Sequence, residues 1–190
     1  MNTSIKLPKL IGLSGTFASG KDTLARYLRD ECQFHSVSMG DIVREMAEEK
    51  YGNKRRETLQ KTATELRQNQ GADFLMIKCL EKPRPLVVNG IRSLGEMKKL
   101  RESGGIMVSV DADAKIRYER MKSRARISDG ETVLTFAEFL AGEKNELHSG
   151  DSDADFNIRA IGEMADVRVD NNGTPEEFIV AALNKLAKFA

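Results

Sequence analysis

The sequence predicts an α/β protein in which a central, five-stranded, mostly parallel sheet is flanked by helices. Short apolar runs alternate with amphipathic helical segments along 190 residues, which is typical of successive βαβ units. No repeat, low-complexity tract or linker divides the chain. Its length, with 40% apolar and 31% charged residues, suits one domain with a sizeable core. We therefore expect residues 1–190 to form a single domain.

The first half of the chain is expected to supply three strands and four helices. An apolar run marks the first strand at 9–14, and Leu24, Ala25 and Leu28 recur at helical spacing in the helix expected at 21–32. The further strands and helices expected in this half are strands 34–38 and 85–89 ("PLVVN") and helices 41–50, 58–70 and 73–81.

The second half is expected to complete the sheet. The remaining strands are expected at 106–111 ("IMVSVD") and 165–170 ("ADVRVD"), and the remaining helices at 94–103, 114–124, 136–146 and 175–188. Ser93 and Glu96 have the spacing of a capping box at a helix start. Pro175, which follows Thr174, suits the first turn of the last helix. Strands that alternate with helices in this way form parallel sheets covered on both faces.

The first strand runs into a loop that fits the pattern G-x-x-x-x-G-K. The loop is Gly15-Thr16-Phe17-Ala18-Ser19-Gly20-Lys21, and a helix is expected to follow it. Backbone N–H groups in such a loop can surround an anion, and the helix adds its positive N-terminal end. Lys21 would supply charge to the β- and γ-phosphates of a nucleotide. The alternative is a glycine-rich turn with a surface lysine, but the flanking strand and helix favour a phosphate-binding loop.

The two residues after the lysine are candidates for holding Mg²⁺. Asp22 stands where a Ser or Thr often binds the ion, and Thr23 follows one position later. We expect Thr23 to lie near the phosphates and Asp22 to orient a water of the magnesium ion. The alternative for Asp22 is a favourable interaction with the helix macrodipole.

Composition argues against several classes of function. The 30 Lys and Arg residues nearly balance the 29 Asp and Glu residues, which disfavours nucleic acid as a partner. No apolar stretch reaches membrane-spanning length, and the N-terminus has no apolar signal block. Two cysteines and two histidines show no metal-ligand spacing. We expect a reduced, cytoplasmic protein with no membrane partner and draw no expectation about its oligomeric state.

Four segments beyond the phosphate loop resemble the P-loop small-molecule kinases, in the same order along the chain. They are "MGDIVREMA" (39–47), "NGIRS" (89–93), "RYERMKSRAR" (117–126) and "ADVRVDNNGTPEEF" (165–178). The first three resemble nucleoside monophosphate kinases, and the last resembles dephospho-CoA kinases, so the chain looks closest to a dephospho-CoA-kinase-like group of nucleotide kinases. The resemblance implies a P-loop NTPase fold, ATP with Mg²⁺, an acceptor-binding subregion at about 40–82 and a helical lid at about 120–150.

Three residues are candidates for acting on or binding the acceptor. Asp41 follows a strand, at the sheet edge where ligands bind in open α/β folds. It would be a general base for a hydroxyl acceptor or would organise Mg²⁺ for a phosphate acceptor; the alternative is a helix N-cap. Arg44 and Arg92 resemble the acceptor-binding arginines of these kinases, and a guanidinium suits a phosphate oxygen pair.

The arginines near the lid and one later loop complete the candidate site. Of Arg120, Arg124 and Arg126, we expect one or two to reach the transferring phosphoryl. Arg124 is the first choice and Arg120 the second, because they are four apart and share a helix face. By resemblance, the loop holding Asn171 and Gly173 packs around the adenine of the donor; the alternative is a turn with an N-cap.

We expect a phosphotransferase that moves the γ-phosphoryl of ATP to a small nucleotide acceptor, a nucleoside or deoxynucleoside monophosphate. One alternative is a dephospho-CoA kinase acting on a ribose hydroxyl, and another is an NTPase switch acting with a protein partner. Two features depart from the family pattern. Asn89 ends the third strand where a carboxylate would be a familiar magnesium partner, and residues 50–80 carry no decisive substrate signature.

Overall fold

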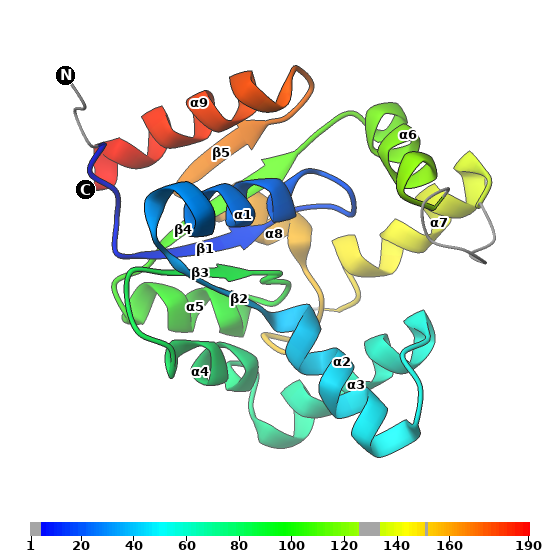
Figure 1. Cartoon of the computed structure of the whole chain (residues 1–190). Coiled ribbons are helices and arrows are strands. Elements are labelled where there is room, and N and C mark those ends of the chain that lie inside the picture. The colour runs from blue at the N-terminus through cyan, green and yellow to red at the C-terminus, as the bar shows by residue number, and fades with distance from the viewer. Residues whose placement is uncertain (1–4, 126–133, 151) are drawn as a thin grey trace.

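The computed structural model describes residues 5–125, 134–150 and 152–190, and it contains the parallel sheet that the sequence predicts (Figure 1). The five strands lie in the order β2-β3-β1-β4-β5, and all four pairings are parallel. Their bounds are β1 (Leu10–Ser14), β2 (His35–Ser38), β3 (Leu86–Asn89), β4 (Ile106–Asp111) and β5 (Val167–Asp170). Because β1 lies at the centre, the loop that follows it leaves the middle of the sheet's carboxyl edge.

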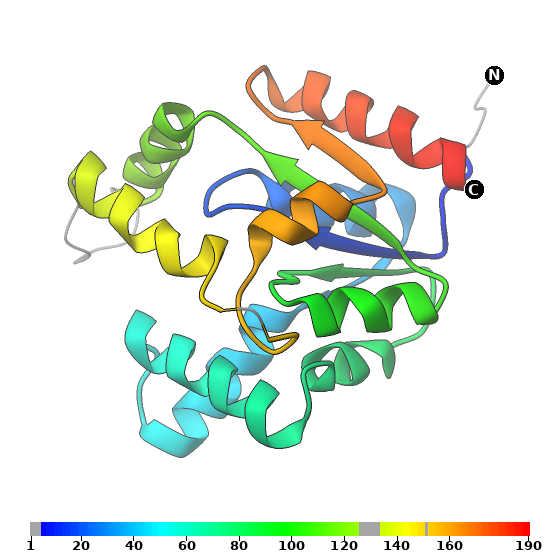
Figure 2. The same ribbon diagram turned by 180° about the vertical axis from the view of Figure 1, so that it is seen from behind.

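Helices cover both faces of the sheet (Figures 1 and 2). On one face, α1 (Lys21–Cys32) and α9 (Pro175–Leu186) bury Leu24, Leu28 and Phe178 against the sheet. A short 3₁₀ turn, η1 (Ala187–Phe189), follows α9. On the other face, residues of α4 (Phe74–Leu80), α5 (Leu94–Glu102) and α8 (Ile158–Met164) join a second apolar cluster. The two buried clusters fix the sheet rigidly between the helices.

Two further helix pairs project beyond the carboxyl ends of the strands (Figure 1). The first pair is α2 (Met39–Tyr51) and α3 (Arg56–Gln70), and the second is α6 (Ala114–Ala125) and α7 (Phe136–Leu147). The pairs fall largely within the residue ranges, about 40–82 and about 120–150, for which the resemblance implies an acceptor-binding subregion and a lid. Part of the predicted lid, residues 126–133, lies outside the described residues.

The predicted helices agree with the structure to within about two residues at each end, with one omission. Helix α8 (Ile158–Met164) was not predicted. It is short, with an Asn157 side chain that accepts a hydrogen bond from the Ala160 N–H and with Ile158 and Ile161 buried one turn apart. Two buried residues in seven give too little periodicity to separate a helix from a loop.

The capping residues act as predicted, and the cysteines are not paired with each other. Ser93 and Glu96 form a capping box at α5, and Pro175 lies in the first turn of α9 behind the capping residue Thr174. Cys32 and Cys79 are free thiols, and burial raises the pKa of Cys79 to about 12. Within the described ranges, no helix is both long and apolar enough to cross a bilayer.

Candidate active site

The phosphate loop requires glycine at both ends of its pattern. Gly15 has a φ of 143°, and a Cβ there would lie 1.9 Å from the backbone oxygen of Val110 on β4. Gly20 has a φ of 110°, and a Cβ there would lie 2.1 Å from the Asn171 side-chain nitrogen. Side chains rarely adopt either backbone conformation, and neither position has room for one. The glycines therefore allow the loop to pack tightly against β4 and the segment after β5.

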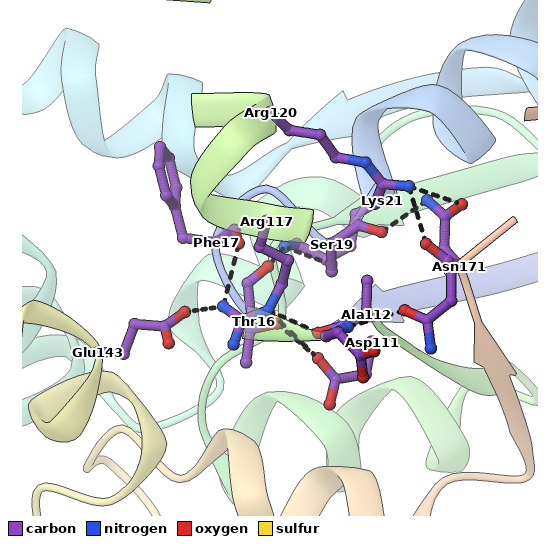
Figure 3. A network of polar contacts seen from close by, with 12 residues as sticks. Thr16, Phe17, Ser19, Lys21, Asp111, Ala112, Arg117, Arg120, Glu143 and Asn171 are labelled. Atoms are coloured by element: carbon purple, nitrogen blue, oxygen red, sulfur yellow. Dashed lines mark hydrogen bonds and ion pairs between the residues drawn. The ribbon is translucent and has the colours of Figure 1, made fainter. Parts of the chain in front are cut away.

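Lys21 folds back over the loop that precedes it (Figure 3). Its Nζ donates to the Thr16 carbonyl oxygen at 2.7 Å and lies 3.5 Å from the Ser19 Oγ. Removal of the ammonium from water, and then the nearby Arg92 guanidinium, lower the pKa of Lys21 to about 8. Both effects penalise the positive charge in the absence of an anion. A phosphate bound in the loop would compensate for this penalty.

Side chains from β4 and α6 fix the first half of the loop (Figure 3). Thr16 Oγ1 donates to Asp111 Oδ1 at 2.8 Å, which ties the loop to the end of β4. Arg117 donates through Nε to the Ala112 carbonyl at 2.8 Å and through Nη1 to the Phe17 carbonyl at 3.4 Å. The same guanidinium is ion-paired with the buried Glu143 of α7. Arg117 therefore couples the phosphate loop to α6 and α7.

A carboxylate and an amide meet at the start of α1. Asn89, at the end of β3, donates through Nδ2 to Asp22 Oδ1 at 2.7 Å. The family pattern has a carboxylate at the end of this strand. In this chain the carboxylate is that of Asp22 on α1, and the residue at the strand end is the amide Asn89. Asn89 Oδ1 is buried with no hydrogen-bond partner among the described residues. This pair presents oxygen atoms beside the phosphate loop, and oxygen is the ligand type that Mg²⁺ prefers.

One hollow lies beside the second half of the phosphate loop, and we call it the donor hollow. It measures about 620 Å³, and its walls include Gly20, Thr23, Arg120, Asn171 and Phe178. Arg120 Nη2 donates to the Asn171 carbonyl at 2.8 Å, and Asn171 Nδ2 donates to the Ser19 carbonyl at 2.8 Å (Figure 3). The segment after β5 is thereby attached to both α6 and the phosphate loop.

A second hollow lies on the other side of the loop, and we call it the acceptor hollow. It measures about 510 Å³ and is walled by α2, α3 and neighbouring segments. Most of its lining is apolar, with Phe17, Met39, Val43, Leu59, Ala63, Leu75, Met121, Leu134 and Phe156 among the lining residues. Its cationic lining residues are Arg44, Lys54, Arg67 and Arg92, and Glu146 is its acidic lining residue. The hollow therefore suits a ligand with an apolar body and an anionic group.

Comparison with known proteins shows the family of the chain. A family described as "AAA domain" (AAA_18) matches residues 11–136. A UPF0200 protein of Thermococcus kodakarensis is 32% identical, over 89% of this chain and 91% of that protein. The chain belongs to these AAA domain and UPF0200 families. A UPF0200/UPF0201 protein of Archaeoglobus fulgidus is also 32% identical over 96% of this chain, but the chain spans only 56% of that protein's length.

Solved structures similar to this UPF0200 chain share its fold. A gluconokinase from Sinorhizobium meliloti superposes with a TM-score of 0.58 at 19% identity, covering 97% of this chain and 95% of that chain. A shikimate kinase from Bacteroides thetaiotaomicron gives a TM-score of 0.61 at 11% identity, covering 95% and 97%. The prediction of a P-loop kinase-like fold is confirmed. At these identities the likeness concerns the fold alone.

The structure of this UPF0200 protein places six of the predicted site residues in the lining of the two hollows, and one of them is Gly20 of the phosphate loop. Thr23, Arg120 and Asn171 line the donor hollow, whereas Arg44 and Arg92 line the acceptor hollow. Ala18, with a positive φ of 60°, lies in the loop between them, and Gly173 follows Asn171 before α9. Arg120 donates to the Asn171 carbonyl beside the donor hollow, and its predicted contact with the transferring phosphoryl stays a prediction.

Asp41 lies outside the lining of both hollows, and the side chains of Arg124 and Arg126 are not among the described parts of the chain. Asp41 is exposed in the first turn of α2, where its Oδ1 accepts a hydrogen bond from Arg44 at 2.6 Å. Its N–H is capped by Ser38 at 3.3 Å, so Ser38 rather than Asp41 is the N-cap. Arg124 belongs to the last turn of α6, but its side chain lies outside what the structure describes, as does the whole of Arg126. The roles predicted for these three residues stay predictions.

Three residues of the site were not predicted from the sequence. Arg117 was named only as the first residue of the segment 117–126 that resembles these kinases, although it contacts the phosphate loop. Glu146 of α7 forms an ion pair with Arg92 at 3.0 Å, and Arg67 of α3 lines the acceptor hollow. The partners of Arg67 and Glu146 lie on other elements, so no local spacing pattern marks them. Only for Arg117 was there a signal, namely its place within a basic run that resembles a kinase lid.

Proposed function

We propose that this protein is an ATP-dependent kinase that transfers the γ-phosphoryl of ATP to a nucleoside or deoxynucleoside monophosphate. The observation that carries this proposal is the place of the phosphate loop between the two hollows. Gly20 of the loop lines the donor hollow, and Phe17 of the same loop lines the acceptor hollow. A nucleotide whose phosphates lie in the loop would direct its terminal phosphoryl toward the acceptor hollow.

The donor would occupy the loop and the donor hollow. The backbone N–H groups of Gly15, Ala18, Ser19 and Gly20 would surround its phosphates, and Lys21 would neutralise the β- and γ-oxygens. Arg120 and Asn171 would hold the base, with Gly173 in the loop that follows. This arrangement supports ATP binding because the Lys21 ammonium, with its lowered pKa, is stabilised by an anion.

Asp22 and Thr23 would hold Mg²⁺ together with the phosphates. The fit rests on the oxygen-rich pair at the start of α1, where Asp22 accepts from Asn89 Nδ2 and the buried Asn89 Oδ1 has no partner among the described residues. The ion would neutralise charge on the transferring group. Asp41, which was predicted as a further magnesium ligand, would act indirectly by orienting Arg44.

The acceptor would bind by its phosphate to Arg44 and Arg92. Guanidinium groups match phosphate oxygens in shape and charge, and the two arginines line the same hollow. A phosphate acceptor is already ionised, so the attacking oxygen needs no general base. Transfer then depends on position and on charge neutralisation, which Lys21 and Arg124 would supply as charge shifts along the phosphoryl path. The apolar walls and the helix pairs α2–α3 and α6–α7 would reduce access of water.

A screen of acceptors tests the proposal. The purified protein, with ATP and Mg²⁺, is given each ribo- and deoxyribonucleoside monophosphate and, separately, dephospho-CoA, and ADP formation is followed. We expect turnover with one or more monophosphates at rates well above acceptor-free hydrolysis. Turnover of dephospho-CoA alone, abolished by Asp41→Asn, would replace the proposal with the hydroxyl-acceptor alternative. Hydrolysis that responds only to an added protein would favour a switch.

A further inference from the structure

A buried ion pair lies at the wall of the acceptor hollow. Arg67 of α3 and Glu96 of α5 have side chains that are only 2% and 0% exposed. Arg67 Nε donates to Glu96 Oε1 at 2.8 Å, and its Nη2 is ion-paired with the same oxygen at 2.7 Å. Charged side chains are seldom buried so fully unless they are paired, and this pair joins α3 to α5.

The Glu96 carboxylate does not accept a hydrogen bond from the third nitrogen of the Arg67 guanidinium. Its second oxygen, Oε2, accepts from the backbone N–H groups of Arg92 at 2.8 Å and Ser93 at 3.2 Å. The carboxylate therefore has a fixed position, and it fixes the guanidinium in turn. The third arginine nitrogen, Arg67 Nη1, is buried with no hydrogen-bond partner among the residues that the structure describes. A buried donor without a partner is costly, which points to a missing acceptor.

The surroundings of Arg67 define the chemistry of that acceptor. The guanidinium lies 4.8 Å from the centre of the Phe156 ring, and both residues line the acceptor hollow. Val43, Leu59 and Ala63 contribute apolar surface to the same hollow. A flat, apolar group that carries a hydrogen-bond acceptor on its edge fits these walls. The cations Arg44 and Arg92 belong to the same hollow and suit the phosphate of that molecule.

We propose that Arg67 determines the specificity of the acceptor site by donating to a ring carbonyl oxygen of the acceptor's base. This proposal rests on the proposed function and names the base class: a keto-bearing base in preference to one with an amine at the same position. Arginine only donates hydrogen bonds, and an amine on the base also donates, so Arg67 could not form a hydrogen bond with that amine. A site built to hydrogen-bond one group strongly rejects the analogue that lacks it.

The test compares acceptors that differ at that group and in the hydrogen on the ring nitrogen beside it. Inosine monophosphate has a carbonyl where adenosine monophosphate has an amine, and uridine and cytidine monophosphates differ in the same way; in each pair only the keto member carries a hydrogen on the neighbouring ring nitrogen. For the wild-type protein we expect kcat/KM to favour the keto member of the productive pair by about 10-fold to 10³-fold. A wild-type protein that uses both members of each pair equally would overturn the inference.

The double variant Arg67→Met with Glu96→Gln removes the guanidinium without leaving a buried charge. The carboxamide introduced by Glu96→Gln keeps an oxygen for the Arg92 and Ser93 N–H groups. Because a methionine side chain has no hydrogen to donate, the keto preference should fall to within about threefold. Arg67→Lys, which keeps a charge for Glu96 on a differently shaped head group, should also weaken the preference and serves if the double variant does not fold.

A matched control separates specificity from stability. Arg101 and Asp166 form an ion pair at 3.0 Å that does not line the acceptor hollow, and Arg101→Gln with Asp166→Asn should leave the keto preference unchanged. If the wild-type protein phosphorylates no monophosphate, the proposed function and this inference fall together. If the wild-type protein phosphorylates a monophosphate, and the folded Arg67 variants keep the full keto preference, only the inference about Arg67 is wrong.

Discussion

At the scale of single residues, the most informative group is the Lys21 ammonium, whose pKa is lowered to about 8 by burial and by Arg92. The charged form attracts phosphates, so we predict that ATP affinity is full below pH 8 and falls as the pH rises through that value. Bound phosphates should raise the pKa again, so kcat at saturating ATP should decline only at higher pH. Titration calorimetry of ATP at several pH values measures the effect.

The control for this pH dependence is Lys21→Arg, which keeps its charge throughout the range. The ATP affinity of this variant should be lower than that of the wild type, because the longer side chain does not fit the contacts with Thr16 and Ser19. This lower affinity should not change as the pH rises through 8. A wild-type affinity that stays constant from pH 7 to pH 9 would show that Lys21 is not the group that titrates.

The ion pair between Arg92 and Glu146 gives a second prediction at this scale. The Arg92 side chain is 35% exposed, and its Nη1 lies 3.0 Å from Glu146 Oε2. An acceptor phosphate would compete with this carboxylate for the guanidinium. We predict that Glu146→Gln lowers the KM for a monophosphate acceptor by about 3-fold to 10-fold, because loss of a competing charge in a partly exposed pair is worth about 1 kcal/mol.

The same variant has a consequence for Lys21 of defined sign. Glu146 is one of the groups that raise the pKa of Lys21, so its removal should move the loss of ATP affinity to a lower pH. Arg92→Gln, which removes a group that lowers this pKa, should shift the loss of affinity to a higher pH and raise the KM for the acceptor. A Glu146→Gln protein with a higher acceptor KM would show that the carboxylate helps to bind the acceptor.

At the scale of elements, the segment between β5 and α9 contains a residue that caps a helix, Thr174, and a residue that contacts the phosphate loop, Asn171. Thr174 caps α9 through a hydrogen bond from the Glu177 N–H at 3.2 Å, whereas Asn171 holds the phosphate loop through Ser19 at 2.8 Å. We predict that Thr174→Ala lowers the free energy of unfolding by about 1 kcal/mol and leaves the KM for ATP unchanged. Asn171→Ala should raise the KM for ATP several-fold. Thermal unfolding and steady-state kinetics of both variants provide the measurements.

This comparison also decides between the two interpretations of the segment. If it is only a turn with an N-cap, both variants should lose stability and neither should change the KM for ATP. If the segment belongs to the donor site, only Asn171→Ala should change that KM, because its side-chain Nδ2 donates to the Ser19 carbonyl and its Oδ1 accepts from Arg120.

The elements themselves were largely predictable, and the reason lies in local signals. The strands β1, β3 and β4 are short, mainly apolar runs, and β5 alternates apolar with charged residues. The helix starts carry capping residues such as Ser93 and Thr174. Such signals depend on neighbours within four residues. Helix α8 (Ile158–Met164) has too few turns to give a periodic pattern, and its burial depends on contacts with α5 and β4.

At the scale of the whole molecule, the phosphate loop could be predicted from the sequence, whereas most of the acceptor hollow could not. The phosphate loop is one continuous segment, so its residues appear together in the sequence. The acceptor hollow is assembled from residues far apart in the chain, such as Phe17, Arg67 and Glu146. Arg44 and Arg92 were found through resemblance to kinases, whereas Arg67 and Glu146 needed the folded structure.

The arrangement of two hollows around one loop predicts how ligands stabilise the whole protein. A ligand at 100 times its Kd stabilises the native state by about 2.7 kcal/mol, and independent sites add. A single molecule that joins adenosine to a second nucleoside through a chain of phosphates would fill both hollows. We predict that it raises the Tm more than ATP alone at the same concentration, since the second half binds at a high effective concentration.

Variants on each side of the loop make this last prediction specific. Arg92→Gln should remove most of the extra rise in Tm while leaving the rise given by ATP itself, because Arg92 lines only the acceptor hollow. Asn171→Ala, on the donor side, should reduce both. The measurement is thermal unfolding with ATP, the joined molecule or neither, in the presence of Mg²⁺. An equal Tm with ATP and with the joined molecule in the wild-type protein would mean that one ligand cannot span the loop, and the second hollow would then not be the acceptor site.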